Sequence, residues 1–190
     1  PHAFKEFGFD SSKTFENLFF SQKAQVFERL KFFMENEAWY RERGLPYTLG
    51  FLFHGEPGCG KTSTLKAIAN MTKRHIVSVP LKNISTTEDL MEVFHGVNIN
   101  QRKIPVRSRL FVLEDIDCAD LKDTVSRRDK KDKDEDEDED EKASVRGQDG
   151  NGAKKEEPPK NGLTLASLLE VFDGVMEMPG RMMVITTNHP

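Results

Sequence analysis

The stretch GEPGCGKT, residues 55–62, decides the fold class of this 190-residue chain. It lies between an apolar run, LGFLFH (residues 49–54), and the alanine- and leucine-bearing stretch STLKAIANM (residues 63–71). A polyphosphate needs several backbone N–H groups at close range, and glycines leave room for that approach. Because a predicted strand precedes the pattern and a predicted helix follows it, we interpret it as a phosphate-binding loop rather than a chance glycine-rich turn.

Each part of this loop has an expected role. The glycines open the backbone to the phosphates, Lys61 is expected to reach the β- and γ-phosphates, and the hydroxyl of Thr62 is expected to bind Mg²⁺. The loop therefore predicts a nucleoside triphosphate and Mg²⁺ as cofactors, and the choice of ATP comes from the family resemblance given below. The predicted nucleotide contacts are Gly55, Glu56, Pro57, Gly58, Cys59, Gly60, Lys61, Thr62 and Ser63.

A second apolar run, LFVL (residues 110–113), is followed by Glu114 and Asp115. Successive residues of a strand point in opposite directions, so one acid can face a metal ion while its neighbour faces an attacking water. By position, Glu114 is expected to address Mg²⁺ and Asp115 to be the general base, although the pattern leaves open which of them is the base. The alternative is a solvated strand end, which the pairing with the phosphate loop disfavours.

A third polar group follows a strand-like run, VITT (residues 184–187), at Asn188. A neutral amide can hydrogen-bond both a γ-phosphate and the attacking water without adding charge. Taken alone, Asn188 would be a polar strand terminus. Together with the other two motifs it completes a predicted catalytic set, which consists of Lys61, Glu114, Asp115 and Asn188.

The periodicity of the chain predicts alternating strands and helices. Apolar residues at helical spacing predict a helix over residues 21–43, capped by Ser21 and ended by Gly44, with Trp39 packed on the core. The run at 49–55 reads as a strand covered on both faces. The remaining predicted helices span residues 60–71, 85–97 and 163–175, and the remaining strands span residues 75–81, 110–117 and 181–188.

Two local predictions accompany this pattern. Ser85 and Glu88 stand at capping-box spacing at the start of the second of these helices, and residues 98–109 read as a basic loop. Strands that alternate with helices predict a parallel α/β sheet with helices on both faces. The phosphate-binding loop after its first strand is typical of α/β P-loop NTPases.

The charge of the chain is concentrated in one segment. The formal net charge is -4, but the run DEDEDEDE at residues 134–141 carries eight negative charges and the remainder sums to +4. We therefore predict no nucleic-acid partner. Residues 126–162 contain almost no apolar side chains and are predicted to be a disordered acidic insertion. It separates a lead-in (residues 1–20) and a first core part (21–125) from a second core part (163–190).

Three further expectations concern cysteines, membranes and termini. Cys59 and Cys118 stand far apart, which favours neither a disulfide framework nor a zinc site. The chain has no run of about 20 apolar residues, the length that a membrane helix requires. Because it begins at Pro1 and ends just after a strand, we expect it to be a fragment of a longer protein.

Three stretches resemble a known family. They are NEAWYRERGLPYTLGFLFHGEPGCGKTS (residues 36–63), LFVLEDIDCA (110–119), and LTLASLLEVFDGV (163–175) with ITTNHP (185–190). Together they resemble the AAA+ ATPases, and within them the branch of the mitochondrial Rieske-protein translocase. The resemblance covers nearly the whole chain except the acidic insertion.

The resemblance implies a sheet in which the strand before Asn188 lies between the other two motif strands, so that Asn188 sits where Lys61 and Asp115 converge. It further implies ATP hydrolysis in a homo-oligomeric ring, a hexamer or heptamer, with a folded protein as client. It implies the inner mitochondrial membrane as location, with a membrane anchor ahead of Pro1. The arginine finger, a fifth strand and a helical lid are expected after Pro190, so the chain alone is expected to hydrolyse ATP poorly.

The chain departs from the family pattern at two points. The family order of the two acids is Asp then Glu, and it is reversed at Glu114 and Asp115. The expected pore-loop stretch, KNISTTED (residues 82–89), has no aromatic residue, which favours the translocase branch over a threading unfoldase. An assembly module that binds ATP and barely cleaves it remains an alternative. A small-molecule kinase is a third, disfavoured by ITTN and by the lack of an arginine-rich lid after the acidic strand.

Overall fold

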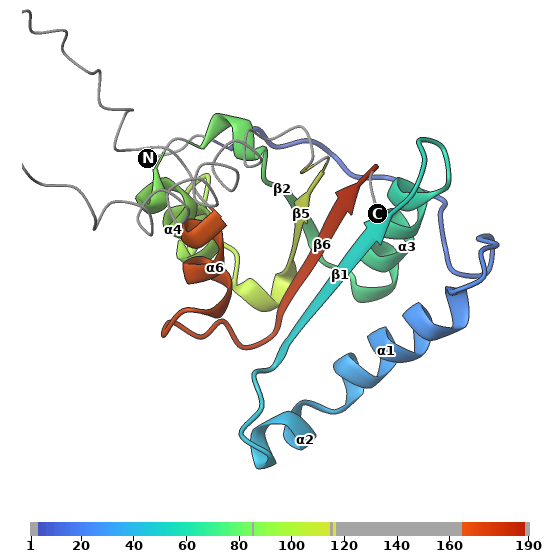
Figure 1. The fold of residues 1–190 in the computed structure, drawn as a ribbon, viewed down its shortest axis with the longest axis horizontal. Helices are drawn as coiled ribbons and strands as arrows, with labels where there is room; N and C mark the ends of the chain where they lie inside the picture. The colour runs from blue at the N-terminus through green and yellow to red at the C-terminus, as the bar shows by residue number, and fades with distance from the viewer. Residues whose placement is uncertain (1–3, 85, 115, 117–164, 189–190) are drawn as a thin grey trace, which may run out of the picture.

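The computed structural model of the chain describes residues 4–84, 86–114, 116 and 165–188 (Figure 1). Within them, four parallel strands form one sheet in the order β1-β6-β5-β2. This confirms the predicted α/β architecture and places β6 between the other two motif strands. The predicted insertion at 126–162 lies outside the described residues. The strands are β1 Thr48–His54, β2 His75–Ser78, β5 Arg109–Leu113 and β6 Arg181–Thr187.

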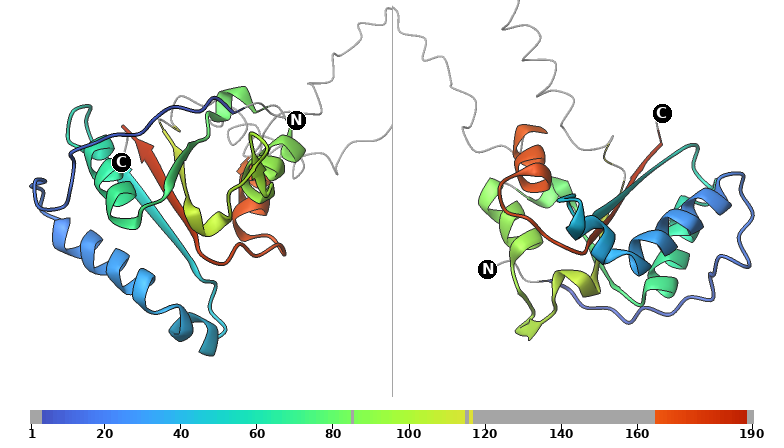
Figure 2. Two further views of the ribbon diagram at one scale, coloured as in Figure 1. Left: turned by 180° about the vertical axis from the view of Figure 1, so that it is seen from behind. Right: turned by 90° about the horizontal axis from the view of Figure 1, so that it is seen from below.

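Helices cover both faces of this sheet (Figures 1 and 2). The helices α1 (Lys23–Glu35) and α3 (Lys61–Thr72) enclose one apolar cluster with Leu110 and Val112 of β5. The alternate residues of β5, Phe111 and Leu113, belong to a second cluster with residues of α4 (Thr87–His95) and α6 (Leu165–Asp173). Because successive side chains of β5 point to opposite faces of the sheet, this strand contributes residues to both clusters. All five of its residues are buried.

The predicted helix over residues 21–43 is divided in two. The helix α1 ends at Glu35, and α2 spans Glu37–Glu42. Asn36 separates them, because its backbone leaves the helical region, with φ of -122° and ψ of 39°, and its side-chain amide donates to the carbonyl of Phe32 at 2.9 Å. The predicted cap was wrong, since the Ser21 hydroxyl donates to the side chain of Gln22 and no side chain caps α1.

Two further sequence predictions for this region are corrected. Trp39 is 36% exposed and lies against Phe32 and the guanidinium of Arg43, so it is a surface residue and not a core anchor. The strand β1 is covered on one face only. Leu49 is buried against the α1/α3 cluster, whereas Leu52 is 60% exposed. The reason is that the cluster formed with α4 and α6 contains no residue of β1, so this cluster does not cover the face that carries Leu52.

The N-cap of α4 lies one residue after the predicted one, Ser85. The hydroxyl of Thr86 accepts from the backbone N–H of Asp89 at 3.1 Å, which makes Thr86 the N-cap. Thr87, in the first turn, donates its hydroxyl to Ser167 on α6 at 3.1 Å. Arg181 donates to the carbonyl of Phe172 at 2.8 Å, near the end of α6. These bonds join the two helices on this face to each other and to β6.

The predicted basic loop contains a small hairpin. Its strands are β3 (Asn98–Ile99) and β4 (Arg102–Lys103), and its two turn residues, Asn100 and Gln101, have φ of 48° and 64°. Short 3₁₀ turns span Leu81–Asn83 and Val106–Ser108. The buried guanidinium of Arg109 donates to the carbonyls of Ile104 and Val97, and so holds the base of the hairpin.

The N-terminal lead-in packs on the domain although residues 4–14 have no regular structure. Phe15 and Leu18 are buried in the α1/α3 cluster, and Phe4 packs against the other cluster. The side-chain amide of Asn70, on α3, donates to the carbonyls of Ser11 and Lys13, each at 2.7 Å. The lead-in therefore touches the core on both faces of the sheet.

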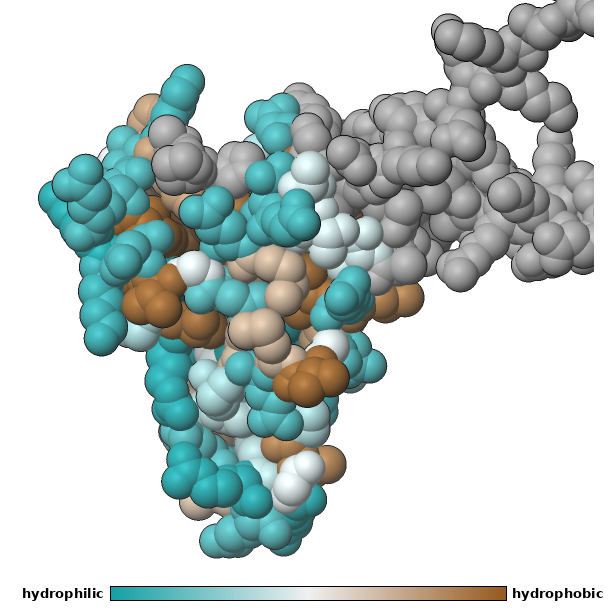
Figure 3. Space-filling model, turned by 90° about the vertical axis from the view of Figure 1, so that its left-hand side faces the viewer, coloured by the Kyte–Doolittle hydropathy of each residue, from teal (hydrophilic) through white to brown (hydrophobic). Residues whose placement is uncertain are grey.

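The surface on the side of α4 and α6 is mostly polar, with apolar side chains in separate patches (Figure 3). Among the described residues, no helix has the length and apolar character needed to cross a membrane.

Candidate functional site

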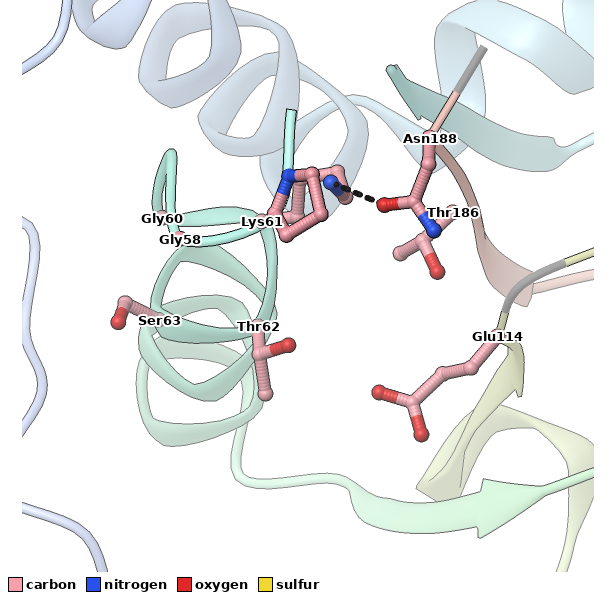
Figure 4. A pocket seen from close by; sticks show the side chains of 9 residues that line it. Gly58, Gly60, Lys61, Thr62, Ser63, Glu114, Thr186 and Asn188 are labelled. Carbon is pink, nitrogen blue, oxygen red and sulfur yellow. Dashed lines mark hydrogen bonds between the residues drawn. The ribbon is translucent and has the colours of Figure 1, made fainter. Parts of the chain in front are cut away.

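A pocket of about 390 Å³ lies where the carboxyl ends of the central strands meet the start of α3 (Figure 4). Three chain segments that are distant in sequence contribute to it: the loop after β1, the residue after β5, and the end of β6. The lining residues are Pro57, Gly58, Gly60, Lys61, Thr62, Ser63, Glu114, Thr186 and Asn188. In open α/β sheets this edge is the usual ligand-binding position.

The loop between β1 and α3 adopts a backbone that favours glycine. Gly55, Gly58 and Gly60 have φ of 138°, 85° and 99°, values that other residues rarely adopt. Gly60 is the N-cap of α3, and no side chain caps this helix end. The first-turn N–H groups of α3 are therefore available to an anion, which the helix dipole also favours.

The ammonium group of Lys61 is fully engaged within the site. It donates to the carbonyl of Gly55 at 2.6 Å, the carbonyl of Glu56 at 3.1 Å and the Oδ1 atom of Asn188 at 3.0 Å. An ammonium group has three donors, so each has an acceptor. The bond to Asn188 joins residues 127 positions apart and brings two of the predicted motifs into direct contact.

Glu114 follows the last residue of β5 and lines the same pocket. Alternation along the strand places it on the α3 side of the sheet, with Leu110 and Val112. Its carboxylate faces the hydroxyl of Thr62 across the pocket, whereas the hydroxyl of Ser63 points to the other side of α3 (Figure 4). Asp115 lies outside the described residues.

Three predicted contacts do not line the pocket. The carbonyls of Gly55 and Glu56 bind Lys61 instead. Cys59 is exposed, with its sulfur 4.0 Å from the Lys61 ammonium. Sequence reasoning missed Thr186, which is 3% exposed and lines the pocket. It stands two residues before Asn188, so the period-two rule for strands was a usable signal.

The donor set fits a magnesium–nucleotide complex. The hydroxyl of Thr62 and the carboxylate of Glu114 are the oxygen donors that Mg²⁺ prefers, and they face each other. No group of three or more His, Cys, Asp and Glu side chains is arranged to hold a metal ion in the described part of the chain.

Comparisons with known proteins agree with this geometry. Residues 51–190 match the family model described as ATPase family associated with various cellular activities (AAA). The chain is 37% identical over 166 residues to "Probable mitochondrial chaperone BCS1-A" of Dictyostelium discoideum, which covers 87% of this chain and 32% of that protein. It is 30% identical over 161 residues to "Mitochondrial chaperone BCS1" of Homo sapiens, covering 83% and 30%.

The bovine protein of the same name is 28% identical over 165 residues, covering 87% of this chain and 32% of the relative. The chain thus spans about a third of the length of these relatives. Their names fit the mitochondrial branch that the sequence resembles. The pocket at the sheet edge and the family match over residues 51–190 lead to one conclusion, that this chain belongs to the AAA family of ATPases.

Proposed function

We propose that this domain binds ATP with Mg²⁺ and hydrolyses it, as part of a homo-oligomeric ring that serves a protein translocase or chaperone. The observation that carries the proposal is the convergence of Lys61, Glu114 and Asn188 on one pocket at the uncapped start of α3. Membership of the AAA family and the chaperone names of the relatives support it.

The phosphate chain would bind to the N–H groups of residues 58–62 and to Lys61. Because all three Lys61 donors are engaged, at least one bond to a loop carbonyl or to Asn188 must be exchanged for a phosphate oxygen. Thr62 and Glu114 would hold Mg²⁺, which neutralises charge on the phosphate oxygens. Asn188 would orient the γ-phosphate or the attacking water, and Asp115 would accept the proton of that water.

The remaining parts of the proposal rest on the family and its named relatives. A neighbouring subunit of a hexamer or heptamer would complete each site, so the 190-residue chain alone would turn over ATP slowly. The proposed client is a folded protein, and the proposed location is the mitochondrion, at its inner membrane. No nucleic acid is proposed as a partner.

The roles of the two acids can be tested in the native protein with the variants Glu114→Gln and Asp115→Asn. If Asp115 is the base, Asp115→Asn should lower kcat by about 100-fold or more and leave the affinity for ATP nearly unchanged. Glu114→Gln should instead weaken the affinity for ATP when Mg²⁺ is present. The matched control is Glu88→Gln, which neutralises an exposed acid of α4. Normal turnover by Asp115→Asn would refute this assignment of the base.

The reversed order of the two acids, Glu114 then Asp115, leaves a second candidate function, an assembly module that binds ATP and cleaves it little. Single-turnover kinetics separate the two. Phosphate release from one equivalent of bound ATP supports the hydrolase, whereas ATP that stays intact over many minutes while the oligomer forms supports the assembly module.

A further inference from the structure

Of the three oxygen acceptors that hold the Lys61 ammonium, only one belongs to a residue that lines the pocket. The carbonyls of Gly55 and Glu56 accept two of its bonds, and neither of these residues lines the pocket. The third bond, at 3.0 Å, goes to the Oδ1 atom of Asn188, which lines the pocket together with Lys61 (Figure 4). A phosphate group in the pocket would therefore reach the ammonium most directly in the place that Asn188 takes.

The amide oxygen of Asn188 and a phosphate oxygen need the same donor of Lys61. Both oxygens only accept hydrogen bonds, and an ammonium group has three donors. Two of these donors bind loop carbonyls that stand only five and six positions away in the chain, so the phosphate loop itself supplies those bonds. The donor that remains for the β-phosphate of a nucleotide is the one that binds Asn188.

We propose that Asn188 competes with the β-phosphate of the nucleotide for Lys61, and thereby speeds the release of ADP. The inference rests on the proposed function, and it adds a role in product release to the orienting role of Asn188. A bond that is made without nucleotide and is lost when the nucleotide binds lowers the affinity for that nucleotide. As the β-phosphate of ADP leaves Lys61, the Oδ1 atom of Asn188 takes the donor back.

Two variants of the native protein remove the amide oxygen in different ways. Asn188→Ala leaves room for a phosphate group or water, whereas Asn188→Leu keeps the approximate size of the half-buried side chain and leaves no cavity. The matched control is Asn83→Ala, because Asn83 is an exposed asparagine on the turn after β2 and does not line the pocket. Calorimetry gives the affinity for ADP, and a chase of fluorescently labelled ADP with unlabelled ADP gives its dissociation rate.

Asn188→Ala should bind ADP about three- to tenfold more tightly than wild type, because a hydrogen bond to a charged group is lost only from the nucleotide-free protein. Most of this gain should be slower dissociation, and Asn83→Ala should match the wild type. AMP has no β-phosphate, so its affinity, measured by displacement of labelled ADP, should stay close to that of wild type. Equal tightening of AMP and ADP would indicate a general change of the pocket and would overturn the inference.

The ADP measurements need no turnover, so they separate this inference from the proposed hydrolysis. Unchanged or weaker ADP binding by Asn188→Ala would overturn the competition even in a protein that hydrolyses ATP. If alanine at this position prevents folding, Asn188→Leu decides by the same criterion. Tighter ADP binding in a protein that cleaves no ATP would support the competition and refute the proposed hydrolysis. A wild-type protein that binds neither ADP nor ATP would refute both.

Discussion

Gly60 and Gly50 differ in backbone conformation, because only Gly60 has a positive φ. Gly60 has a φ of 99° at the start of α3, whereas Gly50 lies within β1 and has no positive φ. A Cβ atom at either position would meet no atom within 4 Å. Any difference between alanine variants therefore comes from the backbone and not from a steric clash.

We expect Gly60→Ala to lower the free energy of unfolding by about 1–2 kcal/mol, because an L-residue in the left-handed region is strained. It should also weaken the affinity for ATP, since the strained loop would move its N–H groups. Gly50→Ala should be neutral or stabilising by about 0.5–1 kcal/mol, because alanine has less conformational entropy to lose. Urea unfolding of the two variants measures the contrast. Equal effects at both positions would show that φ does not decide the outcome.

The lead-in at residues 4–20 depends on α3 for its position. It has little regular structure of its own, but one side-chain amide on α3 serves two of its carbonyls. Because α3 also begins at the phosphate loop, the lead-in and the proposed nucleotide site are attached to opposite ends of one helix.

Asn70→Ala should destabilise the protein by about 1–3 kcal/mol, because it removes two hydrogen bonds to carbonyls of a packed segment. Asn70→Asp should cost more, since it keeps the shape but sets carboxylate oxygens against two carbonyl oxygens. Asn83→Ala is the control, as Asn83 is exposed on the turn after β2. The measurements are urea unfolding and the rate of proteolysis within residues 4–20. If Asn70→Asp unfolds like the control, these bonds do not hold the lead-in.

At the amino-terminal ends of the strands, opposite the pocket, arginine side chains form hydrogen bonds between segments. Arg74 donates to the carbonyls of Arg109 and Gly180, at the starts of β5 and β6, and burial lowers the pKa of Arg74 to about 10. It remains charged at neutral pH.

A second arginine, Arg107, binds the carboxylate of Glu37 with two hydrogen bonds, at 2.6 and 2.7 Å, and so connects α2 to the turn before β5.

The ion pair of Arg107 and Glu37 predicts that the stability of the protein depends on pH. The bonds from Arg107 hold the pKa of Glu37 below its ordinary value of 4.5. A carboxyl whose pKa is lower in the folded protein than in the unfolded chain stabilises the folded state. This contribution is complete when the pH is above the pKa of the unfolded chain, and it is lost as the pH falls through the pKa of the folded protein. Glu37→Gln should therefore be less stable than wild type at pH 7, and the difference should disappear well below pH 4.5.

Urea unfolding of both proteins over this pH range is the measurement. Glu42→Gln is the matched control, because Glu42 is largely exposed at the end of α2 and its carboxylate stands 3.9 Å from the guanidinium of the next residue, Arg43. It should show a smaller difference at pH 7. A Glu37→Gln deficit that persists unchanged in acid would mean that packing, and not charge, accounts for the loss.

Several structural details were ambiguous in the sequence for a definable reason. Ser85 with Glu88 and Thr86 with Asp89 have the same spacing, so capping rules could not choose between them. The structure uses Thr86, in the register that buries Leu90, Val93 and Phe94. Trp39 and Leu52 are apolar and were expected inside, but both lie where no described layer covers them.

The sequence by itself determined the phosphate loop and the order of strands and helices along the chain. It also determined the polar residues that follow two of the strands, which are Glu114, Asp115 and Asn188. These are properties of short segments, set by glycine backbone freedom and by the period of apolar residues. Only the tertiary structure decided that Lys61 bonds to Asn188, that Thr186 joins the pocket and that β1 has an open face. Such facts depend on which strands become neighbours in the sheet, and that is settled by packing between segments distant in sequence, such as β1 with β6 and β5 with β6.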